Sequence, residues 1–222
     1  MNQSLLFLRL ALFLCVIAIF PARAESKNGV IQCANLIYAG TQTSRCFSDE
    51  FLSSIQKKTS VVTERRFKPV KLGSNDLFQF PFVVMTGESS FRLSEVEREN
   101  MKRYLSNGGF LLASAGCSSK DWNKSFRMEM KSILPDAPLK SIPFEHPIYQ
   151  TVYQIKKLTL SHGGTEKATL EGIEINGRIV AVYSSEGLND TAHNKGCCCC
   201  GGNEVQNSLE VNVNILAYAL MH

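Results

Sequence analysis

Short apolar runs alternate with amphipathic segments along most of this chain. The apolar runs are typical of buried parallel strands, and the segments between them repeat apolar residues at helical spacing. The predicted strands are Val30–Tyr38, an extended piece from Val61 that Pro69 interrupts, Pro81–Thr86 and Phe110–Ala113. The predicted helices are Cys46–Lys58, a helix that Ser94 and Glu97 cap and Gly108 ends, and Trp122–Leu134.

The last third of the chain has a different pattern. Prolines discourage regular elements in residues 135–165. Asn176-Gly177 separates two apolar stretches, Ala168–Ile175 and Arg178–Tyr183, and predicts a tight hairpin. A long polar loop at residues 184–206 then leads into an apolar helix, Leu209–Leu220, whose start Asn207 and Glu210 mark as a capping box.

This alternation predicts an α/β protein with a doubly wound, mostly parallel, flavodoxin-like sheet, helices on both faces and a late antiparallel hairpin. Ligands of such sheets bind beyond the carboxyl ends of the strands. The loops expected there are residues 40–45, 87–91, 116–121 and 184–206. Cys46 directly follows the first of these loops, and Cys117 and Cys197–Cys200 lie within the third and fourth. We therefore expect thiols to gather at one rim of the sheet.

The N-terminus has the features of a secretory leader. Leu10–Phe20 is an uninterrupted apolar stretch, and Ala22-Arg23-Ala24 fits a signal-peptidase site. The stretch is shorter than the ~20 apolar residues that span a bilayer. We therefore expect a signal peptide at residues 1–24 and a periplasmic or secreted mature protein without stable membrane insertion.

The length that remains after the leader suits one domain, so we expect a single α/β domain over residues 25–222. The whole chain has 24 basic and 20 acidic residues, a formal net charge of +4, and two of the basic residues, Arg9 and Arg23, lie in the predicted leader. So small an imbalance gives no electrostatic argument for binding nucleic acid. We expect no nucleic-acid partner.

Four consecutive cysteines, Cys197, Cys198, Cys199 and Cys200, lie between glycines in the long polar loop. Thiolates bind zinc and copper, and His193 is four positions before the run, so these five residues form a candidate metal site. The chain has eight cysteines and loses Cys15 with the leader, so an odd number remains in an exported protein. Disulfides with Cys33, Cys46 or Cys117, or an exposed loop without a role, are the alternatives.

Cys117 is a second candidate for chemistry. It follows a predicted strand and precedes a predicted helix, and a helix N-terminus favours the thiolate form of a cysteine. A nucleophilic cysteine needs a base, and His146, His162 and His193 are the choices considered, although none has a diagnostic spacing. A structural or disulfide-bonded cysteine is the alternative. Glu88 and Glu186 are expected at the same rim, where solvated carboxylates are the default.

Six ordered segments carry a further signal: Phe80-Pro81-Phe82 through Gly87, Tyr104 through Leu111, Ser125 through Met130, His146-Pro147-Ile148-Tyr149, Gly177 through Ser184, and Val213 through Leu220. Together they resemble the bacterial family known as domain of unknown function 4159. The resemblance implies a class I glutamine-amidotransferase-like, flavodoxin-type fold and no established reaction. Relatives often have a cysteine at the Cys117 position. Many have histidine after Thr-Gly, where this chain has Glu88.

Three hypotheses for function follow from these patterns. The first is a non-catalytic periplasmic binding module with a thiol-rich metal or redox site at the rim. The second is a Cys117-dependent hydrolase or transferase acting on an amide or carbohydrate-related substrate. The third is a scaffold that binds another envelope protein through the rim loops.

Overall fold

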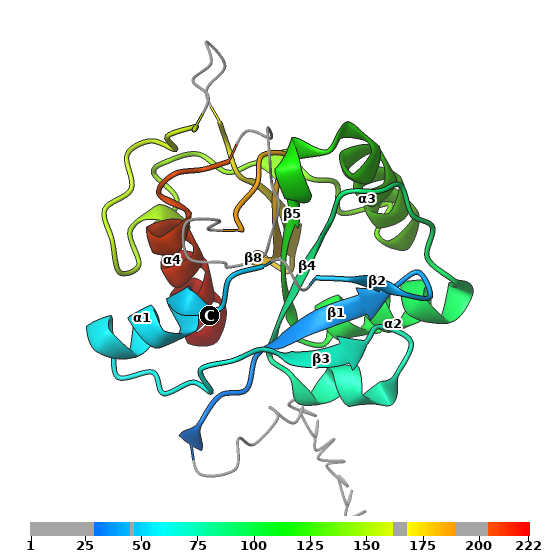
Figure 1. Ribbon diagram of the computed structural model, residues 1–222, viewed down its shortest axis with the longest axis horizontal. Coiled ribbons are helices and arrows are strands. Elements are labelled where there is room, and N and C mark those ends of the chain that lie inside the picture. Colours follow the sequence, from blue (N-terminus) through cyan, green and yellow to red (C-terminus); the bar gives the residue numbers. More distant parts are fainter. Residues whose placement is uncertain (1–28, 45–46, 162–167, 190–203) are drawn as a thin grey trace, which may run out of the picture.

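The computed structural model describes residues 29–44, 47–161, 168–189 and 204–222, and an eight-stranded sheet is at its centre (Figure 1). The strands are β1 Ala34–Tyr38, β2 Gln42–Thr43, β3 Lys68–Lys71, β4 Phe82–Gly87, β5 Phe110–Ala115, β6 Lys140–Ser141, β7 Glu171–Ile175 and β8 Arg178–Ser184. Their order is β2-β1-β4-β5-β8-β7-β6, and β3 pairs with β1 outside this path. The central strands are parallel, which confirms the predicted fold class.

Helices cover both faces of the sheet. The helices α1 Glu50–Lys58 and α4 Ser208–Met221 lie on one face, and α2 Glu95–Ser106 and α3 Lys120–Ile133 lie on the other (Figure 1). Alternate residues of a strand point to opposite faces, and β5 follows this rule. Its Phe110 and Leu112 join the core beneath α1 and α4, whereas Leu111 and Ala113 join the core beneath α2 and α3.

Parallel pairing brings the ends of four strands to one edge of the sheet. β1 pairs with β4, β4 with β5 and β5 with β8, each in parallel. Their last residues are Tyr38, Gly87, Ala115 and Ser184. We call this the carboxyl edge, and the predicted ligand-binding loops after these strands leave the sheet there.

Two predicted local signals are confirmed at their positions. The Ser94 side chain accepts a hydrogen bond from the Glu97 N–H, and the Glu97 carboxylate accepts one from the Ser94 N–H at 2.8 Å, which completes the capping box of α2. Asn176 and Gly177 both have positive φ, of 52° and 76°, as a tight turn between β7 and β8 requires.

Two local expectations are wrong. Pro69 does not interrupt a strand but lies inside β3, which pairs with β1 at the margin of the sheet, where a missing N–H is tolerated. Asn207 does not cap α4 with its side chain. Its amide instead binds the Thr159 N–H and the Lys157 carbonyl, each at 3.1 Å, and so connects α4 to a distant segment.

Gly87, the last residue of β4, occupies a position that has no room for a side chain. A Cβ atom there would lie 2.4 Å from the Tyr38 hydroxyl and 2.7 Å from the Trp122 indole nitrogen. These two groups are hydrogen-bonded to each other at 2.7 Å, and the Tyr38 hydroxyl donates to the Thr86 carbonyl at 2.9 Å. The absence of a side chain at Gly87 therefore lets β1 and α3 join over the end of β4.

Substituting Gly87→Ala should destabilise the protein by about 2 kcal/mol, because the added methyl group displaces a buried hydrogen-bonded pair. Gly73→Ala is the matched control, since its Cβ would meet nothing closer than 3.8 Å. Urea denaturation of the two variants and the wild-type protein measures the difference. Equal free energies of unfolding for the two variants would contradict the expectation.

Candidate functional site

Cys117 lies on a sharp turn at the carboxyl edge, between β5 and α3. The turn is the short helix η3, Gly116–Ser118, in which Cys117 has φ 51° and ψ 29° and Ser118 has φ 52°. Left-handed conformations are uncommon for residues other than glycine and cost roughly 1–2 kcal/mol each, so they persist where surrounding structure imposes them. The two successive left-handed residues place the half-buried Cys117 side chain just before the start of α3.

The end of β4 supplies a carboxylate next to this thiol. The Cys117 thiol donates to Glu88 Oε1, with 3.4 Å between sulfur and oxygen. Gly116 makes the approach possible, because a Cβ atom there would be 3.1 Å from the Gly87 carbonyl oxygen. The loops after β4 and β5 therefore touch, and they present a thiol and a carboxylate side by side.

Ser119 fixes the two loops relative to α3. As the N-cap residue, it accepts a hydrogen bond from the Trp122 N–H at 3.2 Å. Its hydroxyl also donates to the backbone carbonyl of Glu88. One side chain thus ties the beginning of α3 to the residue whose carboxylate meets Cys117.

A buried polar layer lies beneath the carboxyl edge. Thr86 Oγ1 is 2.8 Å from the Ser114 carbonyl oxygen and 3.3 Å from Asn189 Oδ1, and Ser114 Oγ donates to the same Asn189 oxygen at 3.2 Å. Asn189 is 1% exposed, and among the described residues its side-chain nitrogen has no partner. This layer joins β4 and β5 to the loop that leaves β8.

Glu204 is a buried carboxyl group in this region. It is 8% exposed, and neither carboxylate oxygen forms a hydrogen bond of ordinary geometry with a described residue. Burial raises its pKa to about 7, the nearby backbone N–H groups of Asn189 and Cys117 oppose this increase in part, and the charge of Glu88 adds to it. A carboxyl group with such a pKa exchanges its proton near neutral pH.

A scan against known protein families matches residues 32–220 to the family described as Domain of unknown function (DUF4159). The chain belongs to this family. A search of curated proteins finds no match. The family assignment confirms the resemblance seen in the sequence and supplies no reaction, so the chemistry of this DUF4159 domain has to be argued from its own residues.

The structure separates His146 from Cys117. His146 lies at the beginning of the short helix η4, Pro147–Tyr149, where its Nδ1 accepts a hydrogen bond from the Ile148 N–H at 3.2 Å. Its ring lies 5.4 Å from that of Tyr218, near the end of α4. His146 is therefore a histidine that packs at a turn away from Cys117, and the thiol instead donates to the Glu88 carboxylate.

Cys33 directly precedes β1 and therefore lies at the opposite edge of the sheet from Cys117. It is fully buried, and burial raises the pKa of its thiol to about 12. Such a thiol is inert at neutral pH. This position does not support a disulfide between Cys33 and the carboxyl edge.

The predicted metal site falls outside the described residues, since they include neither His193 nor Cys197, Cys198, Cys199 or Cys200. Cys46, His162 and the predicted leader are outside them too. Within residues 29–44, 47–161, 168–189 and 204–222, no three histidine, cysteine or acidic side chains are grouped to hold a metal ion. The same part of the chain has no helix with the length and apolarity needed to cross a bilayer.

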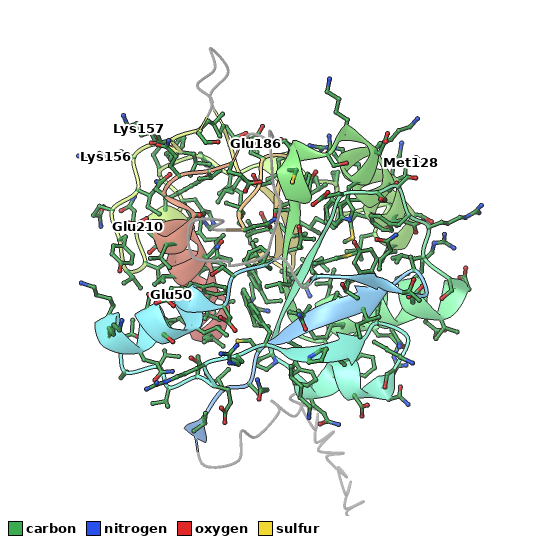
Figure 2. The ribbon with its side chains drawn as sticks, viewed as in Figure 1. Glu50, Met128, Lys156, Lys157, Glu186 and Glu210 are labelled. Carbon is green, nitrogen blue, oxygen red and sulfur yellow. The ribbon has the colours of Figure 1, made fainter. Side chains whose placement is uncertain are left out.

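Sequence reasoning identified Cys117, Glu88 and Glu186 at this edge and missed Glu204. Glu186 follows β8 and lies at the same end of the molecule as η3, although its carboxylate accepts from its neighbour Ser185 at 2.9 Å (Figure 2). The local sequence does not predict Glu204 as a site residue, because Glu204 follows the polar cysteine loop and no pattern around it indicates burial. Pairing with Gly187 on one side and with Ser161 on the other brings it under the rim.

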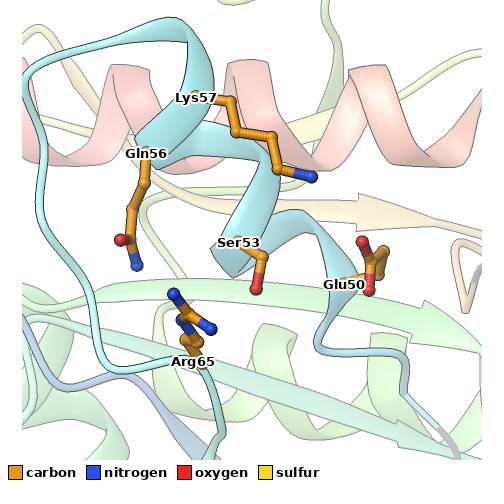
Figure 3. Close-up of a pocket in the computed structure, with 5 residues that line it drawn as sticks. All are labelled: Glu50, Ser53, Gln56, Lys57 and Arg65. Carbon is orange, nitrogen blue, oxygen red and sulfur yellow. The ribbon is translucent and has the colours of Figure 1, made fainter.

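A separate hollow of about 320 Å³ lies beside α1. Glu50, Ser53, Gln56, Lys57 and Arg65 line it, and Figure 3 shows the polar ends of Gln56, Ser53 and Arg65 on one side of the helix. The lining combines two basic side chains and one acidic side chain without a thiol or a buried carboxyl group. It therefore offers less chemistry than the carboxyl edge.

Glu204 should make the stability of the DUF4159 domain depend on pH. Its folded-state pKa of about 7 exceeds its ordinary value of 4.5, so between these values the folded protein keeps a proton that the unfolded chain releases. The free energy of unfolding therefore falls as pH rises across this interval, by roughly 1–2 kcal/mol once solvent screening is allowed for.

Glu204→Gln should remove that contribution, since glutamine does not titrate. Urea denaturation of the wild-type protein and of Glu204→Gln, each at pH 5 and pH 7.5, measures how much the free energy of unfolding falls in each protein. Parallel decreases in stability would show that Glu204 is not the titrating group.

Proposed function

We propose that this DUF4159 domain is a thiol-dependent hydrolase or transferase in which Cys117 is the nucleophile. The observation that carries the proposal is the left-handed turn between β5 and α3, which presents the Cys117 thiol 3.4 Å from the Glu88 carboxylate at the carboxyl edge. Nucleophiles on sharp strand-to-helix turns are exposed to substrate in this way, and backbone strain concentrates at functional positions.

Electrostatics at this turn support a reactive thiol. The backbone N–H groups and dipole at the beginning of α3 favour negative charge, and so they favour the thiolate of Cys117. Glu88 is exposed and accepts the thiol hydrogen bond, which fits the role of proton acceptor. In this proposal the thiol proton passes to Glu88 while sulfur attacks an electrophilic carbon.

The substrate class we propose is an amide, including the amide groups of carbohydrate-related molecules. Attack by sulfur on the amide carbon forms a carbon–sulfur bond, the carbon–nitrogen bond breaks, and the amine departs with the proton that Glu88 took from the thiol. Water or a second acceptor then releases the product and restores the thiol. These reaction steps apply to both a hydrolase, in which water is the acceptor, and a transferase, in which a second molecule is the acceptor.

Iodoacetamide should modify Cys117 of the native protein roughly tenfold faster than it modifies free cysteine at pH 7, because the turn favours the thiolate. Mass spectrometry of the peptide containing residues 104–120 measures the rate. Cys33 is the internal control, since its buried thiol should react only after unfolding. A Cys117 rate at or below that of free cysteine would contradict the proposed nucleophile.

We propose, as a second function, that the loop carrying the four cysteines makes the protein an exported binding module for zinc or copper, or a redox partner. The supporting observation is that Asn189 and Glu204, on either side of residues 190–203, both lie near Cys117 at the carboxyl edge. The proposed ligands are Cys197, Cys198, Cys199, Cys200 and His193. The proposed location is the periplasm or the exterior, after removal of residues 1–24.

The mature protein, purified anaerobically, should contain about one zinc or copper ion per chain, and its intact mass should correspond to a chain that starts at Glu25. Replacing all four cysteines, Cys197 to Cys200, with serine should abolish the metal, because hydroxyl groups are poor ligands for soft ions. Elemental analysis of both proteins measures this. Metal-free wild-type protein, or equal metal in both proteins, would exclude the site.

A further inference from the structure

Glu204 is held in place by backbone contacts on both sides. Its N–H donates to Ser161 Oγ at 3.0 Å, and its carbonyl accepts from the Ser161 N–H at 2.9 Å. The next residue, Val205, donates to the Gly187 carbonyl at 2.9 Å. The backbone around Glu204 is therefore fixed by the segment ending at Ser161 and by the loop after β8.

The carboxyl group itself lies directly over Gly187. A Cβ atom on Gly187 would be 1.9 Å from Glu204 Oε2 and 2.1 Å from Oε1. Gly187 does not have positive φ, so its backbone conformation is open to other residues. The space beside the Glu204 carboxyl group, and not the shape of the turn, is what excludes a side chain at Gly187.

The contacts of this side chain do not require a carboxyl group, because an amide oxygen could also accept from the backbone N–H groups of Asn189 and Cys117. Burying an ionised carboxylate without an ion pair is costly, and an amide or apolar side chain of the same size avoids that cost. Among the described residues, Glu204 makes no ion pair. Among the residues that the structure describes, the titratable groups near it are Glu88, at the end of β4, and Cys117, on η3. The backbone N–H groups of Cys117 and Asn189 are directed at the Glu204 carboxyl group.

We propose that Glu204 is a positioning residue for Cys117, whose state of protonation sets the fraction of the thiol that is ionised. This proposal rests on the proposed role of Cys117 as nucleophile and adds a residue to that site. The neutral carboxyl group places no charge near the sulfur, whereas the carboxylate places a second negative charge beside that of Glu88. The thiolate is therefore favoured while Glu204 keeps its proton and disfavoured once Glu204 loses it.

The pH dependence of Cys117 alkylation tests this proposal in the full-length mature protein. In wild-type protein the rate of Cys117 alkylation should rise less steeply above pH 7 than the rate of a thiol that titrates independently of other groups. Glu204→Gln should match wild type within about twofold at pH 6 and react roughly tenfold faster at pH 8.5, the effect of about one pKa unit. Iodoacetamide is the probe, and the peptide of residues 104–120 is quantified by mass spectrometry.

Gly187→Ala provides an independent variant that leaves Glu204 chemically intact. Its methyl group must push the carboxyl group out of its position, so the pH profile should shift toward that of Glu204→Gln. Glu186→Gln is the matched control, because it removes a carboxylate from the same loop, and its profile should follow that of the wild type. Circular dichroism verifies that each variant is folded, and Gly187→Ala decides the question if Glu204→Gln does not fold.

Parallel pH profiles for wild type, Glu204→Gln and Gly187→Ala would overturn the role of Glu204. The absolute rate at pH 7 separately tests the nucleophile. If Cys117 is alkylated fast and the pH profiles are parallel, only the role of Glu204 is rejected. If Cys117 is alkylated slowly but its pH profile depends on Glu204, only the role of Cys117 as nucleophile is rejected.

Discussion

The close approach of two strand ends, β4 and β5, is the constraint on which the rest of the site depends. Gly116 has no side chain, so its backbone comes close to that of Gly87, and the absence of a side chain at Gly87 lets Tyr38 and Trp122 join above it. This approach places Glu88 beside Cys117, and it lets Ser119 bind the Glu88 carbonyl while capping α3. A side chain at Gly116 would press against the Gly87 carbonyl and the Glu88 side chain, and one at Gly87 would displace the Tyr38–Trp122 pair.

The apolar cores and the polar edge have different tasks in this fold. Two clusters of buried apolar residues, one on each face of the sheet, hold the strands and helices together. They support a carboxyl edge that contains features costly to stability: two successive residues with positive φ, a buried carboxyl group and buried polar atoms without described partners. Such features concentrate where function requires them, because well-packed elements elsewhere compensate for them. This contrast is the physical basis for locating the chemistry at the edge and not at the hollow beside α1.

Part of the site was accessible to sequence reasoning, and the reason differs from residue to residue. Cys117 and Glu88 directly follow apolar strands, so the rule that ligands bind beyond parallel strand ends located both of them. Their contact was not predictable, because it depends on how closely two loops approach at Gly116. His146 was weighed as a base and lies elsewhere, since nothing in one sequence reports its distance from Cys117. Glu204 was missed because its burial arises from pairing with Gly187, which precedes it by a long polar loop.

The sequence by itself predicted the longer strands and helices along the chain and the fold class, because these follow from local periodicity, caps and turns, and six of its segments indicated the family by resemblance. The capping box at Ser94 and the turn at Asn176-Gly177 are local signals, and the structure confirms both. Only the tertiary structure decided that Pro69 lies within β3, that Asn207 binds a distant segment instead of capping α4, and that Glu204 is buried near Cys117. Each of these depends on contacts between residues far apart in the chain, and such contacts are absent from any local pattern.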